Sequence, residues 1–321
     1  STLEIWGALL HGATCVVQEE PLISFEELAR FFVSKRISDA WLTSAVFNAM
    51  VDSHVQCFAG VKQLCTGGER ESPRHMRKFI EALPQVALIH GYGPTENTVF
   101  SHCHHVRLSD TAPGLRVPIG KPISGTIDRI ELSDGSDAGV GNAGELLVGG
   151  LGVALGYRDD PELTSHKFLV RDGVPWYRTG DLVVRRTGGE VEFVGRLDRQ
   201  VKIQGNRIEL EEVESVLRSC PGVGDVFIYV DGELAEEKHL VACFTGQFGR
   251  VPDADAVRSF MLERLPRIMV PRVLCPVDGF ALKTSGKIDE ARMRERVNAL
   301  QAEHRVDVPA RGKEAAVTMT E

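Results

Sequence analysis

The segment 90–96, His-Gly-Tyr-Gly-Pro-Thr-Glu, places an aromatic ring, a hydroxyl and a carboxylate directly after an apolar run at 86–89. A tyrosine exposed beside glycines can stack on a flat ring. The hydroxyl of Thr95 and the carboxylate of Glu96 suit a phosphate group and a hydrated magnesium ion. The same residues also suit a tight turn, in which glycine and proline set the backbone and Thr-Glu caps the next element. Taken alone, the segment is compatible with both interpretations.

Three other segments carry polar groups of a related kind. Asp181 follows a glycine in 176–182, in an expected loop between two apolar β segments, where a carboxylate can accept two hydrogen bonds from a ribose diol. Arg196 could bring a cation to ribose or phosphate, and Asp198 follows it at a candidate hinge. Lys287 comes after a flexible glycine, where its ammonium could neutralise a carboxylate or phosphate. A simple turn and solvated, charged loops remain the alternatives.

The elements that must position these groups follow from periodicity. Up to about residue 105, expected strands at 40–43, 61–66 and 86–89 alternate with helices at 24–36, from 44 into the fifties, and at 73–83. Ser24 with Glu27 forms a capping-box start, and Ser72-Pro73 reads as an N-cap with a first-turn proline. Repeated β-α-β units predict a parallel sheet with ligands beyond the carboxyl ends of its strands. Segments 66–70 and 90–96 both follow such ends, so we expect them to face one crevice.

The pattern changes twice further along the chain. Residues 116–194 are rich in β patterns and glycine, with one helix that begins at Pro161. After Asp198 the sequence predicts a small α+β domain. Its expected strands lie at 201–204, 225–230, 239–244 and 272–276, and its expected helices at 209–220 and 253–265. Residues 298–321, rich in charge, alanine and valine, are typical of a linker.

Composition restricts the class of protein. A chain of 321 residues ordinarily forms about two domains. A net charge of −8 argues against a general nucleic-acid or anionic-membrane surface. No apolar run approaches the roughly 20 residues that span a bilayer, and no signal peptide is recognisable. The seven cysteines form no CxxC pair, which fits reduced thiols. The sequence therefore predicts a cytoplasmic protein without a nucleic-acid or membrane partner.

Six segments, in this order, resemble the core motifs of the adenylation domains of nonribosomal peptide synthetases, members of the adenylate-forming enzyme superfamily. The motifs lie at Gly91–Glu96, Gly144–Tyr157, Tyr177–Leu182, Gly195–Glu214, Leu265–Pro271 and Ser285–Asp289. The resemblance extends from Ser1 to about residue 295, and the version IQGNRIELEEVE at 203–214 is similar to the amino-acid-activating branch.

The resemblance implies an α/β fold. Residues 1–197 would form the C-terminal part of a large adenylate-forming core, with a parallel sheet layer and a β-rich subdomain. Residues 198–297 would form a small, mobile α+β lid domain. Residues 298–321 would form a linker or tail, which could lead towards a carrier domain.

The resemblance also implies a reaction, in which an amino acid is activated with ATP and Mg²⁺ as aminoacyl-AMP and then passed to the phosphopantetheine thiol of a carrier protein. The implied nucleotide-binding residues are Gly67, Gly68, Glu69, Tyr92, Gly93, Thr95, Asp181 and Arg196. The implied catalytic residues are Lys287, Thr95 and Glu96, with Glu96 also at Mg²⁺. Lys287 would act where charge develops on oxygens between two anions. Asp198 is the implied hinge, and Gly205 would face the pantetheine channel.

Partners and substrate class follow from the same resemblance. The implied partners are an amino-acid substrate, a peptidyl carrier domain in cis or in trans, and neighbouring synthetase domains. The implied substrate pocket contains Leu3, Trp41, Cys65, Gly67, Gly91, Val99 and Phe100. Because none of these side chains is charged, burying a charged substrate side chain there would cost several kcal/mol. We therefore expect an apolar, aliphatic amino acid.

Departures from the family pattern qualify these expectations. His90 replaces the usual asparagine, and Ile268 stands where tyrosine is common. The family's glycine-rich phosphate loop with its lysine is not found in the chain, and the aspartate that anchors the substrate amino group would precede Ser1. We therefore expect that about the first half of the domain is missing and that this chain alone has little or no adenylation activity. A noncatalytic remnant or binding module that keeps the carrier-docking lid, and an acyl- or aryl-acid–CoA ligase, are the alternatives.

Overall fold

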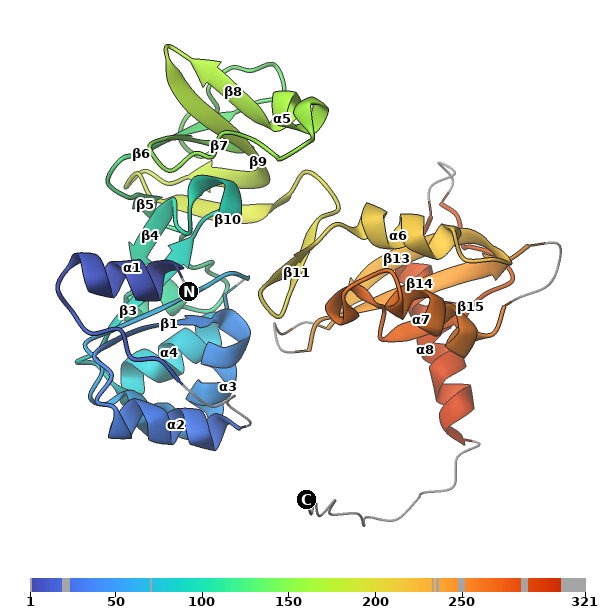
Figure 1. Ribbon diagram of the computed structural model, residues 1–321, viewed down its shortest axis with the longest axis horizontal. Coiled ribbons are helices and arrows are strands. Elements are labelled where there is room, and N and C mark those ends of the chain that lie inside the picture. The colour runs from blue at the N-terminus through green and yellow to red at the C-terminus, as the bar shows by residue number, and fades with distance from the viewer. Residues whose placement is uncertain are drawn as a thin grey trace. The chain divides into compact units, whose positions relative to one another are not determined.

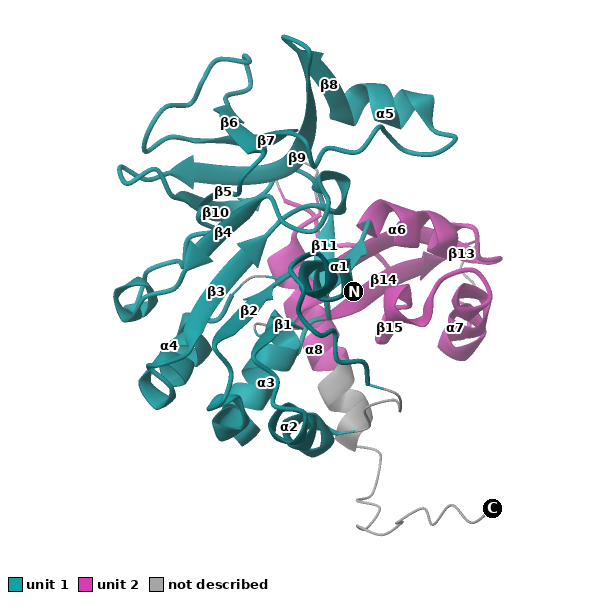
Figure 2. Cartoon of the chain, turned by 60° about the vertical axis from the view of Figure 1, so that its left-hand side comes forward, with its two compact units in different colours: residues 1–209, 232–238 teal, residues 210–231, 239–321 magenta. Residues whose placement is uncertain are grey.

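The computed structural model describes residues 2–18, 24–69, 71–232, 234, 237–247, 252–283 and 288–306, the last six of these by backbone alone. The chain divides into two units (Figures 1 and 2). Unit 1 contains residues 1–209 and 232–238, and unit 2 contains residues 210–231 and 239–321. In the described part of the chain, no helix is long and apolar enough to span a membrane.

The first sheet of unit 1 has five strands in the order β1-β2-β3-β4-β5. Its strands are β1 (Asp39–Thr43), β2 (Gln63–Gly67), β3 (Ala87–Tyr92), β4 (His102–His105) and β5 (Lys121–Pro122). β1, β2 and β3 run parallel, as predicted, whereas β4 and β5 are antiparallel to their neighbours. In this register Thr43, Gly67 and Gly91 are aligned across the carboxyl ends of the parallel strands.

Three helices cover one face of this sheet (Figure 1). The helices of this region are α1 (Thr2–Leu10), α2 (Phe25–Ser34), α3 (Ser44–His54) and α4 (Pro73–Ala82), with short 3-10 turns at Val55–Phe58, Thr95–Asn97 and Leu108–Thr111. Fully buried Phe47, Phe79 and Leu64 belong to the core between α2–α4 and the sheet. α1 differs, because none of its residues 2–10 is buried.

The two predicted helix starts have different outcomes. The capping box is confirmed: Ser24 Oγ accepts from the Glu27 amide at 3.2 Å, and Glu27 accepts from the Ser24 amide at 3.1 Å. Pro73 begins α4 as predicted, but Ser72 does not cap it with its side chain. The Ser72 hydroxyl instead lies 2.7 Å from Nδ1 of the buried His75.

The second sheet of unit 1 follows the order β10-β9-β7-β6, with β8 paired to β9. Its elements are β6 (Thr126–Glu131), β7 (Ala143–Gly150), α5 (Pro161–Lys167), β8 (Phe168–Arg171), β9 (Val174–Arg185) and β10 (Val191–Arg196). A hairpin of β11 (Val201–Ile203) and β12 (Asn206–Ile208) completes the unit. The core of the sheet includes fully buried Leu146, Tyr177 and Val183.

Two expected loops are strands. β3 extends through Tyr92, so His90 to Tyr92 do not belong to a loop. The sequence predicts a loop at Asp181, but this residue lies inside the continuous strand β9. Gly180, with φ +72°, accommodates the register shift opposite 145–147, so the strand continues where Thr-Gly-Asp suggested a turn.

The described residues of unit 2 form a three-stranded sheet in the order β13-β14-β15, together with three helices. These elements are α6 (Leu210–Arg218), β13 (Val223–Asp231), β14 (His239–Gly246), α7 (Ala254–Leu262), a 3-10 turn (Arg267–Met269), β15 (Val273–Pro276) and α8 (Glu290–Val306). Tyr229, Cys243 and Met293 are buried in its core. α8 continues to Val306, so residues 298–306 of the expected linker at 298–321 are helical.

The units divide after Glu209, whereas the sequence places a domain boundary and hinge at 197–198. The hairpin β11–β12 therefore belongs to unit 1. The hinge at Asp198 concerns motion and stays a prediction.

Candidate functional site

The carboxyl ends of β2 and β3 lie side by side, as expected for segments 66–70 and 90–96. Gly67 and Gly91 are register partners, and a Cβ on Gly67 would lie 2.0 Å from the carbonyl oxygen of Gly91. Gly68 follows with φ +88°, a conformation that glycine adopts without strain. Gly93 is also constrained, because a Cβ there would lie 2.5 Å from the Val99 carbonyl oxygen. These glycines bring backbone groups close together where the strands end.

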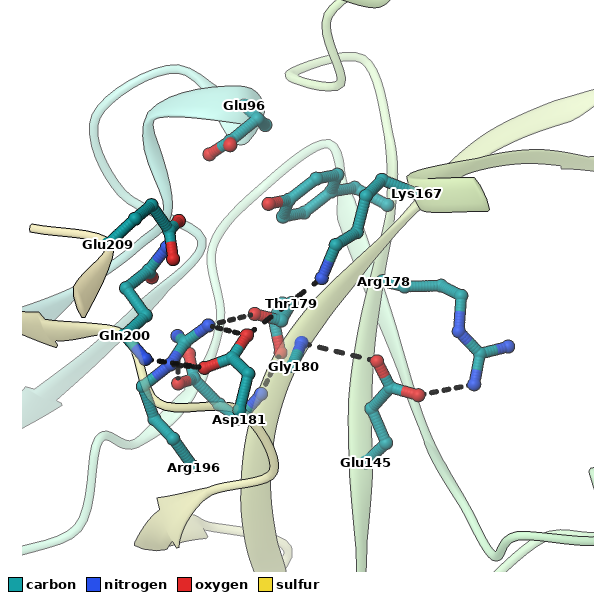
Figure 3. A network of polar contacts seen from close by, with 12 residues as sticks. Glu96, Glu145, Lys167, Arg178, Thr179, Gly180, Asp181, Arg196, Gln200 and Glu209 are labelled. Carbon is teal, nitrogen blue, oxygen red and sulfur yellow. Dashed lines mark hydrogen bonds and ion pairs between the residues drawn. The ribbon is translucent and has the colours of Figure 1, made fainter. Parts of the chain in front are cut away.

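Tyr92, Asp181 and Arg196 converge from β3, β9 and β10. The Tyr92 hydroxyl donates to one oxygen of Asp181, and Arg196 Nη1 donates to the other at 2.6 Å. Figure 3 shows Arg196 reaching Asp181 beside Thr179, whose hydroxyl accepts from the Asp181 amide at 3.0 Å. Burial raises the pKa of Asp181, although Arg196 opposes the shift. Three residues predicted to bind nucleotide thus form one hydrogen-bonded group.

Arg196 also holds the predicted hinge residue. Its Nε and Nη2 donate to the two oxygens of Asp198 at 2.6 and 2.7 Å, and the Gln200 amide donates to Asp198 at 3.2 Å. Burial alone would raise the pKa of Asp198, but the hydrogen bonds and charge of Arg196 outweigh it and lower the pKa. Asp198 is therefore an ionised partner of Arg196 in this arrangement.

Glu96 is buried and surrounded by donors. Its Oε1 accepts from the Tyr157 hydroxyl at 2.6 Å, and Arg207 Nη1 lies 2.6 and 2.7 Å from its two oxygens. Tyr177 completes the group, 3.2 Å from Tyr157 and 3.3 Å from Arg207 between polar atoms. Burial would raise the pKa of Glu96, yet Tyr157 and Arg207 lower it overall.

This donor set bears on the predicted magnesium site. Both Glu96 oxygens face the Arg207 guanidinium, which is a cation in the place where Mg²⁺ would bind. Mg²⁺ therefore does not fit Glu96 while Arg207 occupies this position. Thr95, the residue before Glu96, is exposed.

Several predicted pocket residues meet around the end of β3. Trp41 and Cys65 are register partners on β1 and β2. A Cβ on Gly91 would lie 2.6 Å from the Phe100 ring and 3.1 Å from Cys65 Sγ. Val99 precedes Phe100 with φ +68°, a strained conformation for a β-branched residue. The structure thus brings Cys65, Gly91 and Phe100 together.

Other predicted residues are not brought into these groups. Leu3 lies on α1 and is 38% exposed. Lys287 lies outside the described residues. Glu69 and Gly205, predicted for nucleotide and pantetheine respectively, contact each other: the Gly205 amide donates to Glu69 at 2.6 Å.

Sequence reasoning missed the partners of the predicted residues. Three residues around Glu96 lie inside the recognised motifs, but no function is predicted for them from the sequence: Tyr157, Tyr177 and Arg207. Lys202 also lies there, and burial lowers its pKa although Asp181 opposes the shift. Lys202 stands between the apolar residues Val201 and Ile203 in a short strand, and this position was the sequence feature that could have indicated a role for it.

A buried histidine, His102, packs against the ring of Tyr92. The His102 ring lies 5.9 Å from the Tyr92 ring in an edge-on contact, and its Nε2 lies 3.0 Å from Asp128. Asp128 in turn pairs with Arg185 at 3.0 Å. The histidines at 102, 104 and 105 give no indication in the sequence of this partner in another strand.

Comparisons with known proteins agree on one family. The family model described as AMP-binding enzyme matches residues 1–158. Tyrocidine synthase 3 of Brevibacillus parabrevis is 39% identical over 292 residues, which are 90% of this chain and 4% of that protein. Bacitracin synthase 1 of Bacillus licheniformis is 34% identical over 314 residues, 96% of this chain and 6% of that protein. The chain thus spans a small part of the length of these relatives.

A solved structure gives the same result. Holo-PA1221, described as an NRPS protein containing adenylation and PCP domains, is 36% identical with a TM-score of 0.83. The match covers 92% of this chain and 51% of that one, so this chain spans about half the length of the solved relative. Order of motifs, fold and relatives agree: the chain belongs to the adenylate-forming, AMP-binding enzymes, in the adenylation-domain family of nonribosomal peptide synthetases.

Proposed function

We propose that this chain serves in the ATP-dependent activation of an amino acid and in its transfer to the phosphopantetheine thiol of a carrier domain. In the first step a substrate carboxylate oxygen attacks the α-phosphorus of ATP, and pyrophosphate leaves. In the second step the thiol sulfur attacks the carbonyl carbon of the aminoacyl-AMP, and AMP leaves.

The observation that carries the proposal is the group of Tyr92, Asp181 and Arg196. It places an aromatic ring, a buried carboxylate and a guanidinium beside the strand ends at which ligands bind in open α/β sheets. Tyr92 would stack on the adenine, and Asp181 would accept from the ribose hydroxyls when its present donors yield. Thr95 would contact the α-phosphate, and Glu96 would take Mg²⁺ once Arg207 has moved away. Lys287 would lie between substrate carboxylate and adenylate oxygen.

The substrate class rests on the residues that meet at the end of β3. Cys65 is 7% exposed, and it and Phe100 both lie near Gly91. Neither side chain carries a charge, so a buried charged side chain of a substrate would lack a partner there. An apolar, aliphatic amino acid is therefore the proposed substrate. A carrier domain is the proposed partner, because the solved relative contains adenylation and PCP domains.

Equilibrium binding of AMP and of valyl-sulfamoyl-adenosine, an analogue of the aminoacyl-adenylate, tests the proposal. Asp181→Asn should weaken both by about tenfold or more, because a hydrogen bond to a charged group contributes about 1.5–3 kcal/mol. Asp134→Asn is the matched control, since Asp134 hydrogen-bonds only Ser136 among the described residues and lies in an exposed turn. Binding that Asp181→Asn leaves unchanged, or no binding at millimolar ligand, would refute the proposal.

A further inference from the structure

The hairpin β11–β12 is attached at its tip to the loop that follows β2. We propose that Glu69 is a positioning residue for thioester formation: its carboxylate, with Lys238 as partner cation, fixes the hairpin tip that contains Gly205. This inference rests on the proposed function, because it assigns Gly205 to the path of the pantetheine thiol. Glu69, Gly205 and Lys238 are called the Glu69 cluster below.

The contacts of the Glu69 cluster come from three separate segments of unit 1. Glu69 Oε1 accepts from the Gly205 amide at 2.6 Å. Lys238 Nζ, from segment 232–238, lies 3.6 Å from Glu69 Oε2. The Glu69 side chain is fully buried, and that of Lys238 is 20% exposed. One carboxylate thus joins the loop after β2, the hairpin tip and the segment before β14.

The hairpin tip is a two-residue turn, Gln204-Gly205, between the paired residues Ile203 and Asn206, and a tight hairpin turn of this length favours positive φ at both positions. Gln204 and Gly205 have φ of +50° and +78°, so both lie in the left-handed region. A Cβ on Gly205 would lie 3.1 Å from the methyl group of Thr43, at the end of β1. Glycine therefore lets the tip approach the ends of β1 and β2 closely enough for its amide to reach Glu69.

The energetics make the contacts interdependent. A buried carboxylate is costly unless donors and an opposite charge compensate for the lost water. Among the described residues, Oε2 of Glu69 accepts no hydrogen bond, so the Gly205 amide and the Lys238 charge are its main compensation. If the hairpin leaves, Glu69 loses the 2.6 Å hydrogen bond from the Gly205 amide. The carboxylate therefore favours the arrangement in which the hairpin tip is in place.

Hydrogen exchange of the Gly205 amide in the 321-residue chain tests the cluster without catalysis. Glu69→Ala and Lys238→Met should each accelerate this exchange, by about tenfold for Glu69→Ala, because the lost hydrogen bond to a charged group is of that size. Lys238→Arg should restore protection. Lys121→Met is the matched control, since Lys121 pairs with Glu190 at a similar 3.7 Å away from the cluster.

The outcomes separate the alternatives. Unchanged exchange in Lys238→Met and Glu69→Ala, or equal acceleration by Lys121→Met, would overturn the assignment. If Glu69→Ala does not fold, the partly exposed Lys238 decides the question by itself.

A kinetic measurement then separates positioning from mere stability. With synthetic aminoacyl-AMP supplied, Lys238→Met should slow transfer of the aminoacyl group to a carrier thiol several-fold and leave AMP binding unchanged, because Lys238 has no assigned part in nucleotide binding. Equal loss of transfer and of AMP binding would contradict the assignment. Absence of AMP binding by the unmodified protein would count against the proposed function, whereas the exchange result would still decide whether the cluster fixes the hairpin.

Discussion

Glu71 and His90 form a buried pair beneath the strand ends, with 3.3 Å between Glu71 Oε1 and His90 Nε2. His90 Nδ1 lies 2.8 Å from the Pro118 carbonyl oxygen, so Nδ1 carries the proton and Nε2 is left as an acceptor. Ser44 donates to Glu71 Oε1 at 2.9 Å. Burial raises the pKa of Glu71 to about 8 and lowers that of His90 to about 4. The pair is therefore neutral at pH 7, with the proton on the carboxyl group.

This pair predicts a pH dependence of stability. The folded chain retains the Glu71 proton up to about pH 8, whereas the unfolded chain loses it near the ordinary value of 4.5, so the free energy of unfolding falls as pH rises through this range. His90 acts in the opposite direction, between its ordinary pKa of 6.5 and about 4, so the interval from pH 6.5 to 8 isolates Glu71. In the unmodified chain the free energy of unfolding should fall by about 2 kcal/mol over that interval. Glu71→Gln keeps a neutral donor that does not titrate, so this fall should be absent in the variant.

Urea unfolding at pH 6.5 and 8 measures the effect. Glu81→Gln is the control, because the Glu81 side chain is 54% exposed in an ion pair on α4. The same pH dependence in Glu71→Gln and in the unmodified chain would show that the pair is ionised in the fold.

At the level of residues, local sequence patterns draw attention to one residue of a contact, but they do not identify the distant residue with which it pairs. Tyr92, Asp181 and Arg196 are predicted to serve one ligand because motif order indicates it. Arg207 on Glu96 is not predicted, since its partner is 111 residues away and local patterns carry no such pairing. His90 stands out in sequence only as a tolerated replacement, because its pairing with Glu71 depends on burial that no local pattern reveals.

At the level of elements, periodicity located most strands and helices, and errors occurred where backbone conformation decides. Thr-Gly-Asp at 179–181 has the composition of a turn, yet pairing with β7 and β10 keeps it within β9. Ser72 does stand at the N-cap of α4 as predicted, but its hydroxyl contacts His75 of the same helix instead of a backbone amide. Strand pairing thus overrides the turn preference at 179–181, whereas at Ser72 a neighbouring side chain takes the capping hydroxyl.

The aligned strand ends predict unequal effects of two similar substitutions. Gly67→Ala should destabilise the chain by about 3 kcal/mol or more, because its Cβ would overlap the carbonyl oxygen of Gly91 at 2.0 Å and paired backbone cannot move aside. Gly91→Ala should cost less, about 1–2 kcal/mol, because its Cβ meets the Phe100 ring, which can rotate.

Chemical unfolding of both variants in parallel measures the difference, with Gly60→Ala as control, since a Cβ there meets no atom within 4 Å. Equal losses for Gly67→Ala and Gly91→Ala would show that the two strand ends are not tightly paired.

At the level of the whole molecule, each unit has a hydrophobic core of its own. Phe79 is fully buried in the core beneath the first sheet of unit 1, and Met293 in the core of unit 2. The change of pattern along the chain predicts the division into a larger and a smaller part, but not the place of the hairpin β11–β12. A short strand pair carries too little periodicity to indicate which core it joins.

Separate cores predict separate responses to cavities. Met293→Ala should destabilise unit 2 by about 2–5 kcal/mol, because it removes a fully buried side chain. Hydrogen exchange should then accelerate in β13 and β14 and remain unchanged in β2 and β3, with the reverse for Phe79→Ala. Acceleration throughout the chain in either variant would indicate one cooperative unit instead of two.

Thr98 and Val99 have φ of +51° and +68°, and a left-handed conformation costs an ordinary residue about 1–2 kcal/mol. Glycine or asparagine at position 99 would relieve that strain. Valine is therefore not the residue that backbone conformation favours at this position. If Val99 lines the proposed substrate pocket, position 99 is a favourable place to alter the preferred amino acid. Replacements there begin from a strained residue, and libraries at this position should retain folded members more often than libraries at the fully packed Gly67.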